Sequence, residues 1–438
     1  MARERASAID VVTTVCSAHG AVGIELLVLH AAAFLAVVTL TPATELFPNN
    51  GDVLLYFQYA ERVAQGEIPY RDIDLEYPPL ALLPVVLPYL AWPFGRPSFE
   101  TYQWLFVTQS AGLSVATAVI VAWVGRQRAG GEGMLRGMAL YAVMAVATAP
   151  LLAWRFDLFP AMLGLGGVWL VLAGRPSLAG VAIGLGFAAK VFPVVLLPVL
   201  AIYLLAAGRW GSVGRLVAGF VVAATLVWLP ISLAAPDEIL SFAIRQQERP
   251  IQIESVQGGL QLLSHLLFGA DIQVTFGFGS VNVIGRGTEQ ALDLQGIVSG
   301  LAIAGTLGLF FLRLVDDVRR IGAPAAQTLI DAGVAVMLAL LLTNKVFSAQ
   351  YIIWLLPLAA LLRRPQAYLV VLASVLTLLV FPLNYERLIA LEQLPIIALN
   401  VRNAVLVALL IILLVGPTGW ARFRGCSLAT RTGYSPPS

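Results

Sequence analysis

The amino-acid sequence predicts an all-α polytopic membrane protein that forms a single integral membrane domain over residues 1–438. The 438 residues are 59% hydrophobic and 12% charged, whereas a soluble domain carries about 25% charged residues. A bilayer can cover that much apolar surface, but a soluble core of this size cannot. The net charge of +2 provides no basic field for nucleic acid. We therefore expect a multi-pass protein of the cell membrane, with the lipid bilayer as a partner and no nucleic acid.

The membrane-spanning segments are predicted from apolar runs, and a perpendicular helix needs about 20 such residues. Several runs are shorter, so those helices must be broken or enclosed by the bundle. The run over 80–94 contains Pro84, Pro88 and Pro93. Proline interrupts helical hydrogen bonding, so we predict a re-entrant or interfacial segment there. About twelve spans remain, near 21–41, 101–124, 135–153, 158–174, 177–190, 191–207, 214–234, 296–314, 324–343, 350–362, 366–383 and 395–416.

The charges predict the orientation. With this set of spans both termini are cytoplasmic, including the tail over 417–438, and most arginines fall in short inner loops, as the positive-inside rule requires. Most carboxylates fall instead in two long outer loops, 42–100 and 235–295. Long loops in a compact chain are usually functional, so we predict an active site on the outer face.

The first outer loop contains a predicted amphipathic helix over 53–65, which we expect on the membrane surface. Asp52 stands at its beginning. It either caps the helix or acts as a rigidly held functional carboxylate, and the two roles are compatible. The acids that precede Tyr77 are interpreted as solvated loop charges. They are Asp72, Asp74 and Glu76.

The chain has two lysines, Lys190 and Lys345, and each is followed by Val-Phe at the predicted outer end of a span. Lysine near the apolar zone is costly and needs an anionic partner, and a compact ammonium suits phosphate. We predict phosphate binding; the alternative is that both side chains reach to the lipid headgroups.

Other polar residues accompany these two. Arg155 and Asp157, in WRFD, either pair with each other or face a cavity. The second outer loop carries a glycine-rich stretch, TFGFGSVNVIGRG, which we predict to be flexible. Three charged residues fall within spans and are expected to form structural pairs there. They are Glu25, Asp331 and Arg402.

Several motifs then occur in a recognisable order. A Gly-Asp pair and an amphipathic helix precede G-x-x-PY-x-D and YPPL, and later come RFDLFPAMLGL, LAGVAIGLGFAAKVFPVVLLP and NKVFSAQYIIWLLP. This order resembles the polyprenol-phosphate-sugar-dependent glycosyltransferases of the GT-C fold, a bundle of about 12 transmembrane helices. More narrowly it resembles glycosyltransferase family 87, which comprises polyprenyl-phosphate-mannose mannosyltransferases and related arabinofuranosyltransferases. RFD replaces a Gly-Gln-x-Asn pattern of many relatives, which leaves the acceptor open.

The resemblance implies an inverting transfer of a sugar, most often mannose, from a polyprenyl phosphate to a hydroxyl of a glycolipid or polysaccharide acceptor. It implies Asp52 as the base, and no metal, nucleotide or other cofactor. A monomer is expected. Candidate ligands of the donor phosphate are Lys190, Lys345, Arg155 and Arg249. Candidate cavity residues are Asp157, Tyr77, Gln350, Tyr351, His265 and Glu254.

Two other classes of protein remain as alternatives, a lipid or glycolipid transporter or flippase, and a non-catalytic membrane partner. Transporters often bind their cargo near the membrane midplane between repeats. Here the charges gather at one face beside large loops, which favours an enzyme.

Overall fold

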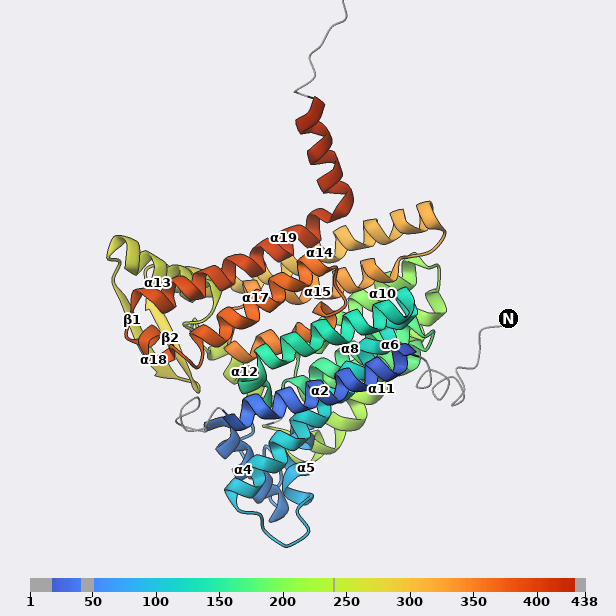
Figure 1. Ribbon diagram of the computed structural model, residues 1–438. Coiled ribbons are helices and arrows are strands. Elements are labelled where there is room, and N and C mark those ends of the chain that lie inside the picture. Colours follow the sequence, from blue (N-terminus) through green and yellow to red (C-terminus); the bar gives the residue numbers. More distant parts are fainter. Residues whose placement is uncertain (1–17, 41–50, 239–240, 430–438) are drawn as a thin grey trace, which may run out of the picture.

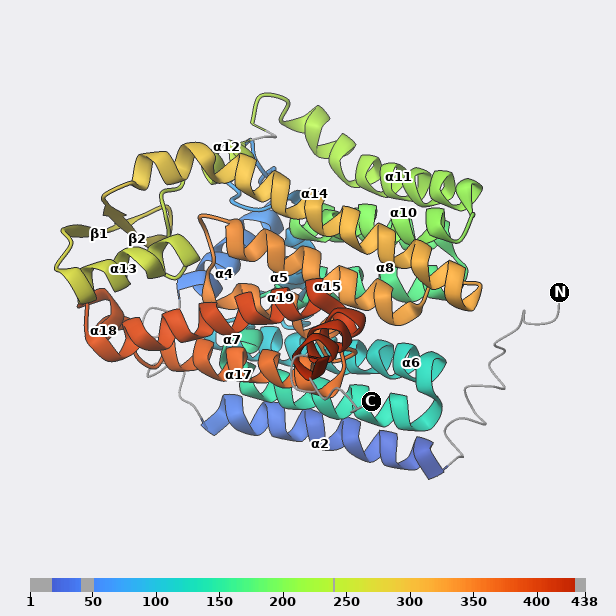
Figure 2. The same cartoon turned by 90° about the horizontal axis from the view of Figure 1, so that it is seen from above.

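The structure, a computed structural model, describes residues 18–40, 51–238 and 241–429. Long helices run side by side in one bundle (Figure 1). Figure 2 shows α2 (Ala18–Leu40) and α11 (Trp210–Ala234) on opposite flanks of it. Among the described residues, six helices are long and apolar enough to cross a membrane. They lie over Gly20–Thr39, Phe99–Ala147, Trp210–Ala234, Thr288–Ile321, Ala326–Thr343 and Gln393–Gly416. The prediction of a mostly helical, multi-span protein is confirmed, whereas the number of about twelve spans stays a prediction.

Helix α6 (Phe99–Ala147) covers two of the predicted spans. Its backbone leaves the helical region at Ala129 and Gly130, and the two limbs fold back on each other. Ser114 on one limb hydrogen-bonds Tyr141 on the other over 3.1 Å. Near the bend a Cβ on Gly125 would overlap the Gly133 carbonyl, so the limbs touch because both positions are glycine.

The middle of the chain contains shorter helices. Helix α7 (Ala149–Ala153) precedes α8 (Leu158–Leu172) and α9 (Pro176–Ala189), and the 3₁₀ turn η2 (Phe192–Val195) precedes α10 (Leu196–Ala206). Helix α9 packs closely on α11, because a Cβ on Gly180 or Gly219 would meet backbone atoms of the partner helix. The first half of the bundle is therefore held together by small residues at helix contacts.

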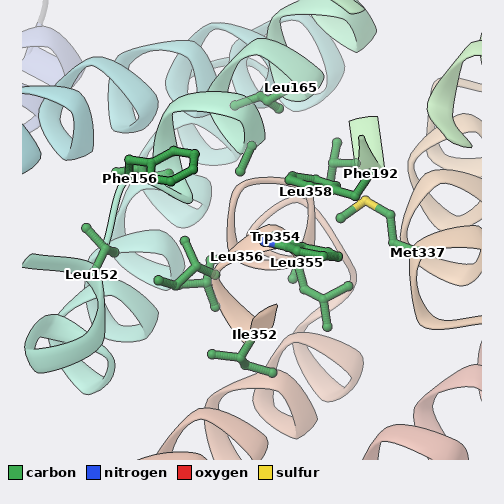
Figure 3. Close-up of a cluster of buried hydrophobic side chains, with 14 of the residues drawn as sticks. Leu152, Phe156, Leu165, Phe192, Met337, Ile352, Trp354, Leu355, Leu356 and Leu358 are labelled. Carbon is green, nitrogen blue, oxygen red and sulfur yellow. The ribbon is translucent and has the colours of Figure 1, made fainter. Parts of the chain in front are cut away.

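The C-terminal half contains α14 (Thr288–Ile321), α15 (Ala326–Thr343), α17 (Arg364–Val380), α18 (Tyr385–Ile389) and α19 (Gln393–Ala429), which bends at Gly416. The predicted span 350–362 is instead a 3₁₀ turn, η3 (Ala349–Trp354), and one short helix, α16 (Leu356–Ala359). Figure 3 shows this segment inside the bundle, where Ile352, Trp354 and Leu358 pack against surrounding helices. Irregular backbone at membrane depth is tolerated where protein encloses it.

The first long loop forms α4 (Gly51–Ala64), the 3₁₀ turn η1 (Pro79–Ala81) and α5 (Leu82–Leu90), which lie below the bundle in Figure 1. Helix α4 agrees with the helix predicted over 53–65. Its Val53, Phe57 and Ala60 are buried in the protein core, so this stripe packs on protein and not on the membrane surface as predicted. Helix α5 continues through Pro88. It is only about 14 Å long, too short to cross a bilayer. Its re-entrant path stays a prediction.

The second long loop forms α12 (Ser241–Glu248), α13 (Val256–Phe268) and an antiparallel hairpin of β1 (Ile272–Gly277) and β2 (Ser280–Gly285). The prediction that this glycine-rich stretch is flexible was wrong, because it forms the hairpin. The predicted all-α fold also did not include these two strands. Phe278 and Gly279 take positive φ angles of 54° and 65°, as a two-residue type I′ turn requires. Alternation in IQVTFG and SVNVIG is the overlooked strand signal.

The charged residues predicted within spans have different surroundings. Asp331 pairs with Arg363 over 3.1 Å, which confirms a structural pair. Arg402 is fully buried and donates to the main-chain oxygen of Glu254. Glu25 is exposed on α2.

Candidate active site

Polar residues from distant segments meet at one end of the bundle. They come from the beginning of α4, the turn between α7 and α8, the C-terminal ends of α9 and α15, and the segment between α12 and α13. Elements α13, β1, β2 and α18 lie at this end (Figure 1). Most candidate residues named from the sequence are therefore brought together.

Asp52 lies in the first turn of α4, where the helix dipole favours a carboxylate. The position before the helix lies outside the described residues, so a capping residue is not identified there. The Asp52 Oδ2 atom pairs with Arg155 Nε over 2.8 Å, and its side chain is 35% exposed. Burial, together with the Asp52 charge, raises the pKa of Tyr77 well above its ordinary value. Asp52 is thus held by an arginine beside the half-buried Tyr77 and stays accessible.

Asp157 and Arg155 do not pair with each other. Asp157 Oδ1 pairs with Lys190 Nζ over 2.6 Å and accepts a hydrogen bond from Trp354 Nε1 over 2.6 Å. The Asp157 side chain is 1% exposed and that of Lys190 is 13% exposed. Lys190 therefore lies inside the protein as half of a largely buried ion pair.

Aromatic rings surround the Lys190 ammonium. Its Nζ atom lies 5.1 Å from the ring centre of Phe156, 5.3 Å from that of Tyr351 and 5.5 Å from that of Trp354. The Trp354 ring lies between Phe192 and Tyr351, 4.0 Å from each. The two Lys-Val-Phe segments thus meet through a stack of rings, since Phe192 belongs to the first and the turn η3 follows the second.

Lys345 and Arg249 form a second cationic group. Lys345 Nζ donates to the Gln247 main-chain oxygen over 2.6 Å, and Arg249 donates to Gln246 over 3.3 Å. Within the described part of the chain neither is in an ion pair with a carboxylate, and the buried Nε of Arg249 has no hydrogen-bond partner. Burial and the charge of Arg249 lower the pKa of Lys345. Lys345 and Arg249 are thus two neighbouring cations that have no carboxylate partner among the described residues.

Glu254 follows Arg249 by five residues and is 3% exposed. Its carboxylate accepts a hydrogen bond from Gln252 over 3.2 Å, and Gln252 also bonds Ser348 over 2.8 Å. Burial raises the pKa of Glu254 to about 7, although the charge of Arg402 opposes this shift. Glu254 is therefore a buried carboxyl group, close in sequence to Arg249, whose pKa lies well above its ordinary value.

Two candidate residues lie apart from these contacts. The ring of His265, near the end of α13, hydrogen-bonds the Ala270 oxygen over 2.8 Å, which closes the helix end. Gln350 is partly buried in η3, and none of the polar contacts described above involves it. Their roles in the cavity stay predictions.

Sequence reasoning missed two features of this end of the molecule. Trp354 was not a candidate, although its indole N–H fixes Asp157. Arg245 pairs with Asp74 and, over 3.2 Å, with Glu76, so these acids are not simply solvated. Arg245, Asp74 and Glu76 line a cavity of about 420 Å³ with Tyr59. Within the described ranges no three His, Cys, Asp or Glu side chains are placed to hold a metal ion.

The fold and the site define a multi-span membrane protein with a charged, aromatic-lined site at one end of its helices. The chain belongs to glycosyltransferase family 87, whose model matches residues 75–329. This protein is therefore a membrane glycosyltransferase. The matched region contains Arg155, Asp157, Lys190, Arg249 and Glu254, and it begins after Asp52 and ends before Lys345.

Two solved structures are similar to this chain. The crystal structure of ArnT from Cupriavidus metallidurans bound to undecaprenyl phosphate is 16% identical, with a TM-score of 0.46, over 96% of this chain and 82% of that one. The apo structure of the same protein is 16% identical, with a TM-score of 0.47, over 93% and 80%. No curated protein matches the sequence. Membership of the family therefore rests on the family match.

Proposed function

We propose that this glycosyltransferase transfers a sugar, mannose as the first candidate, from a polyprenyl phosphate to a hydroxyl of a glycolipid or polysaccharide on the outer face of the membrane. The observation that carries the proposal is the accessible Asp52 carboxylate, which Arg155 holds at 2.8 Å beside the Lys190–Asp157 pair. The donor's lipid tail would lie in the bilayer. The position of the site at one end of the helices supports this arrangement, because it places the reacting sugar near headgroup level.

The proposed reaction is a single displacement. Asp52 takes the proton of the acceptor hydroxyl as that oxygen attacks the anomeric carbon. The bond from the anomeric carbon to the phosphate oxygen breaks, and its electron pair leaves with the polyprenyl phosphate. One displacement inverts the anomeric configuration. Arg155 keeps the carboxylate in place, a role that requires no contact with the donor.

The phosphate that leaves gains charge and needs cations rather than an acid. Lys345 and Arg249 best suit this role, because neither is neutralised by a carboxylate in the described part of the chain. Lys190 and Arg155 are less suited, since Asp157 and Asp52 already pair with them. We assign the donor phosphate to Lys345 and Arg249.

The rings around Lys190 supply a second requirement, an apolar surface for the sugar. Tyr77, Tyr351 and Trp354 present aromatic carbon next to polar groups. This combination suits a ligand that has one apolar side and one hydrated side. The Lys190–Asp157 pair fixes the indole and phenol rings through Trp354. In this proposal Lys190 is a positioning residue.

The test is an assay of the purified full-length protein with synthetic polyprenyl-phosphate mannose and glycoside acceptors. The proposal expects a glycosylated product whose new bond has the opposite anomeric configuration to the donor, read by NMR. Retained configuration, or transfer that requires a nucleotide sugar, would contradict it. A parallel reaction with polyprenyl-phosphate arabinofuranose as donor shows which of the two sugars the enzyme transfers.

A further inference from the structure

Two adjoining cavities lie next to the proposed site, and the mechanism above uses neither. The first, of about 420 Å³, is lined by α4 and the loop after it. The second, of about 540 Å³, is lined by α12 and the hairpin turn at Gly277 and Phe278. Arg245 lines both cavities, so they adjoin at this side chain.

The first cavity follows the helix face that begins with Asp52. Leu55, Tyr59 and Arg62 line it, and their spacing of three, seven and ten residues from Asp52 places all four on one side of the helix. Tyr59 lies about 10 Å from Asp52 along the helix axis. A glycan whose reacting hydroxyl is at Asp52 would therefore extend into this cavity.

A second connection joins the cavity to the site. Glu76 lines the cavity, and its neighbour Tyr77 lies 6.0 Å from the Lys190 ammonium. The loop that carries both is fixed, because the Tyr70 hydroxyl donates to the Tyr77 oxygen over 2.6 Å and the Tyr59 hydroxyl donates to the Asp74 oxygen over 3.1 Å. The relative position of cavity and site is thus set by buried tyrosines.

The lining of the first cavity suits hydroxyl groups. Gln58 provides an amide that both donates and accepts, Glu76 and Asp74 accept, and Arg245 donates. The Arg245 and Glu76 side chains are 33% and 35% exposed, so they can still bind a ligand. The acidic residues that line this cavity are Glu61, Asp74 and Glu76, and the basic ones are Arg62 and Arg245. Glu61 also pairs with Arg96, so the first cavity is close to neutral.

The second cavity provides the negative charge, because Asp237, Glu238 and Glu248 line it beside the shared Arg245. Helix α12 lies between these acids and the cationic pair of Lys345 and Arg249. Its Arg245 pairs with Asp74, whereas its Gln247 main-chain oxygen accepts a hydrogen bond from Lys345. An anionic ligand would be repelled on the acidic side and attracted on the other.

We infer that the two cavities are the acceptor subsite, and that it takes an uncharged glycan and rejects phosphorylated or carboxylated ones. This inference rests on the proposed function for the meaning of "acceptor". The binding of the glycan is a separate property and can be measured without the donor.

The test uses the full-length protein and the methyl glycosides of mannobiose, arabinobiose and maltose, each with a 6-phosphate or, for arabinobiose, a 5-phosphate analogue. Saturation-transfer NMR measures their binding without any turnover. At least one neutral glycoside is expected to bind about tenfold more tightly than its phosphorylated analogue. Gln58→Trp places an indole in the first cavity and is expected to weaken that binding about tenfold. Gln58 is exposed, so this change leaves the fold intact.

A second variant tests the charge. Asp74→Asn with Glu76→Gln is expected to reduce the preference for the neutral glycoside, whereas Glu100→Gln, an exposed acid at the beginning of α6 that lines neither cavity, is not. The inference is wrong if no neutral glycoside binds, if Gln58→Trp binds like wild type, or if the preference is the same in all proteins. Failure of sugar transfer would instead contradict the proposed function, because binding needs no donor.

Discussion

Arg155 forms an ion pair with Asp52, with its Nε 2.8 Å from Asp52 Oδ2, and so joins the turn before α8 to the beginning of α4. The guanidinium is mostly buried, with 12% of its side chain exposed, while the carboxylate is 35% exposed. A mostly buried guanidinium thus orients an accessible carboxylate. This geometry is what a general base needs, because its oxygen must meet the acceptor hydroxyl at a defined place.

Arg155→Gln tests this orienting role. We expect kcat to fall about 100-fold, because the carboxylate loses its fixed position, while donor affinity changes little. Steady-state kinetics and donor binding by calorimetry separate the two effects. Arg387→Gln, which removes an exposed arginine on α18, is the matched control. A loss of donor affinity with unchanged kcat would place Arg155 on the phosphate instead.

Lys345→Ala and Arg249→Ala are expected to act on the donor. Each removes a charged hydrogen-bond donor worth about 1.5–3 kcal/mol, so donor affinity should fall about 10- to 100-fold. Calorimetry with the intact polyprenyl-phosphate sugar gives the dissociation constants, with Arg387→Ala as control. Unchanged affinity in both variants would exclude this pair from the phosphate site.

Lys190→Met is expected to lower stability, because it leaves the buried Asp157 carboxylate without its counter-ion. Breaking one half of a buried pair costs about 3–5 kcal/mol. Adding Asp157→Asn should restore most of that loss, since the amide oxygen can still accept from Trp354. Thermal unfolding in detergent measures both. If the single variant unfolds like wild type, the pair has no structural role and Lys190 becomes available for phosphate.

Glu254 should make stability depend on pH. Burial raises its pKa from 4.5 to about 7 in the folded protein, so the folded state binds more protons between these two values. Stability therefore falls as pH rises from about 4.5 to about 7, by about 3 kcal/mol from this group. Glu254→Gln should remove that part of the slope. Thermal midpoints of both proteins, measured between pH 4.5 and 7, test this expectation. The same slope in Glu254→Gln and wild type would contradict a raised pKa for Glu254.

Much of the fold follows from the sequence, because helix length and apolar runs are local properties. The helix predicted over 53–65 follows from the spacing of its apolar residues. The run over 350–362 was counted among the spans, although its short length already indicated a broken or enclosed segment. The number of spans does not follow, because burial in protein and burial in lipid require the same apolar residues. The hairpin of β1 and β2 was missed because its glycines suggested flexibility, although its alternation was visible.

The site was predictable as a set of residues but not as a set of contacts. Arg155 and Asp157 are two residues apart, yet each pairs with a residue distant in sequence. Trp354 looked like any apolar side chain, and Asp74 looked like a solvated acid until Arg245 was placed beside it. Such pairings depend on how α4, α8, α9 and α12 pack, which no local pattern encodes.

The most direct measurement is transfer by Asp52→Asn in the purified protein, with polyprenyl-phosphate mannose as donor. Asparagine keeps the size of the side chain and a hydrogen-bond acceptor for Arg155, but it cannot take a proton. We expect transfer to be lost while donor affinity remains close to that of wild type. Turnover at the wild-type rate would contradict the assignment of Asp52 as the base, and with it the central claim of this mechanism.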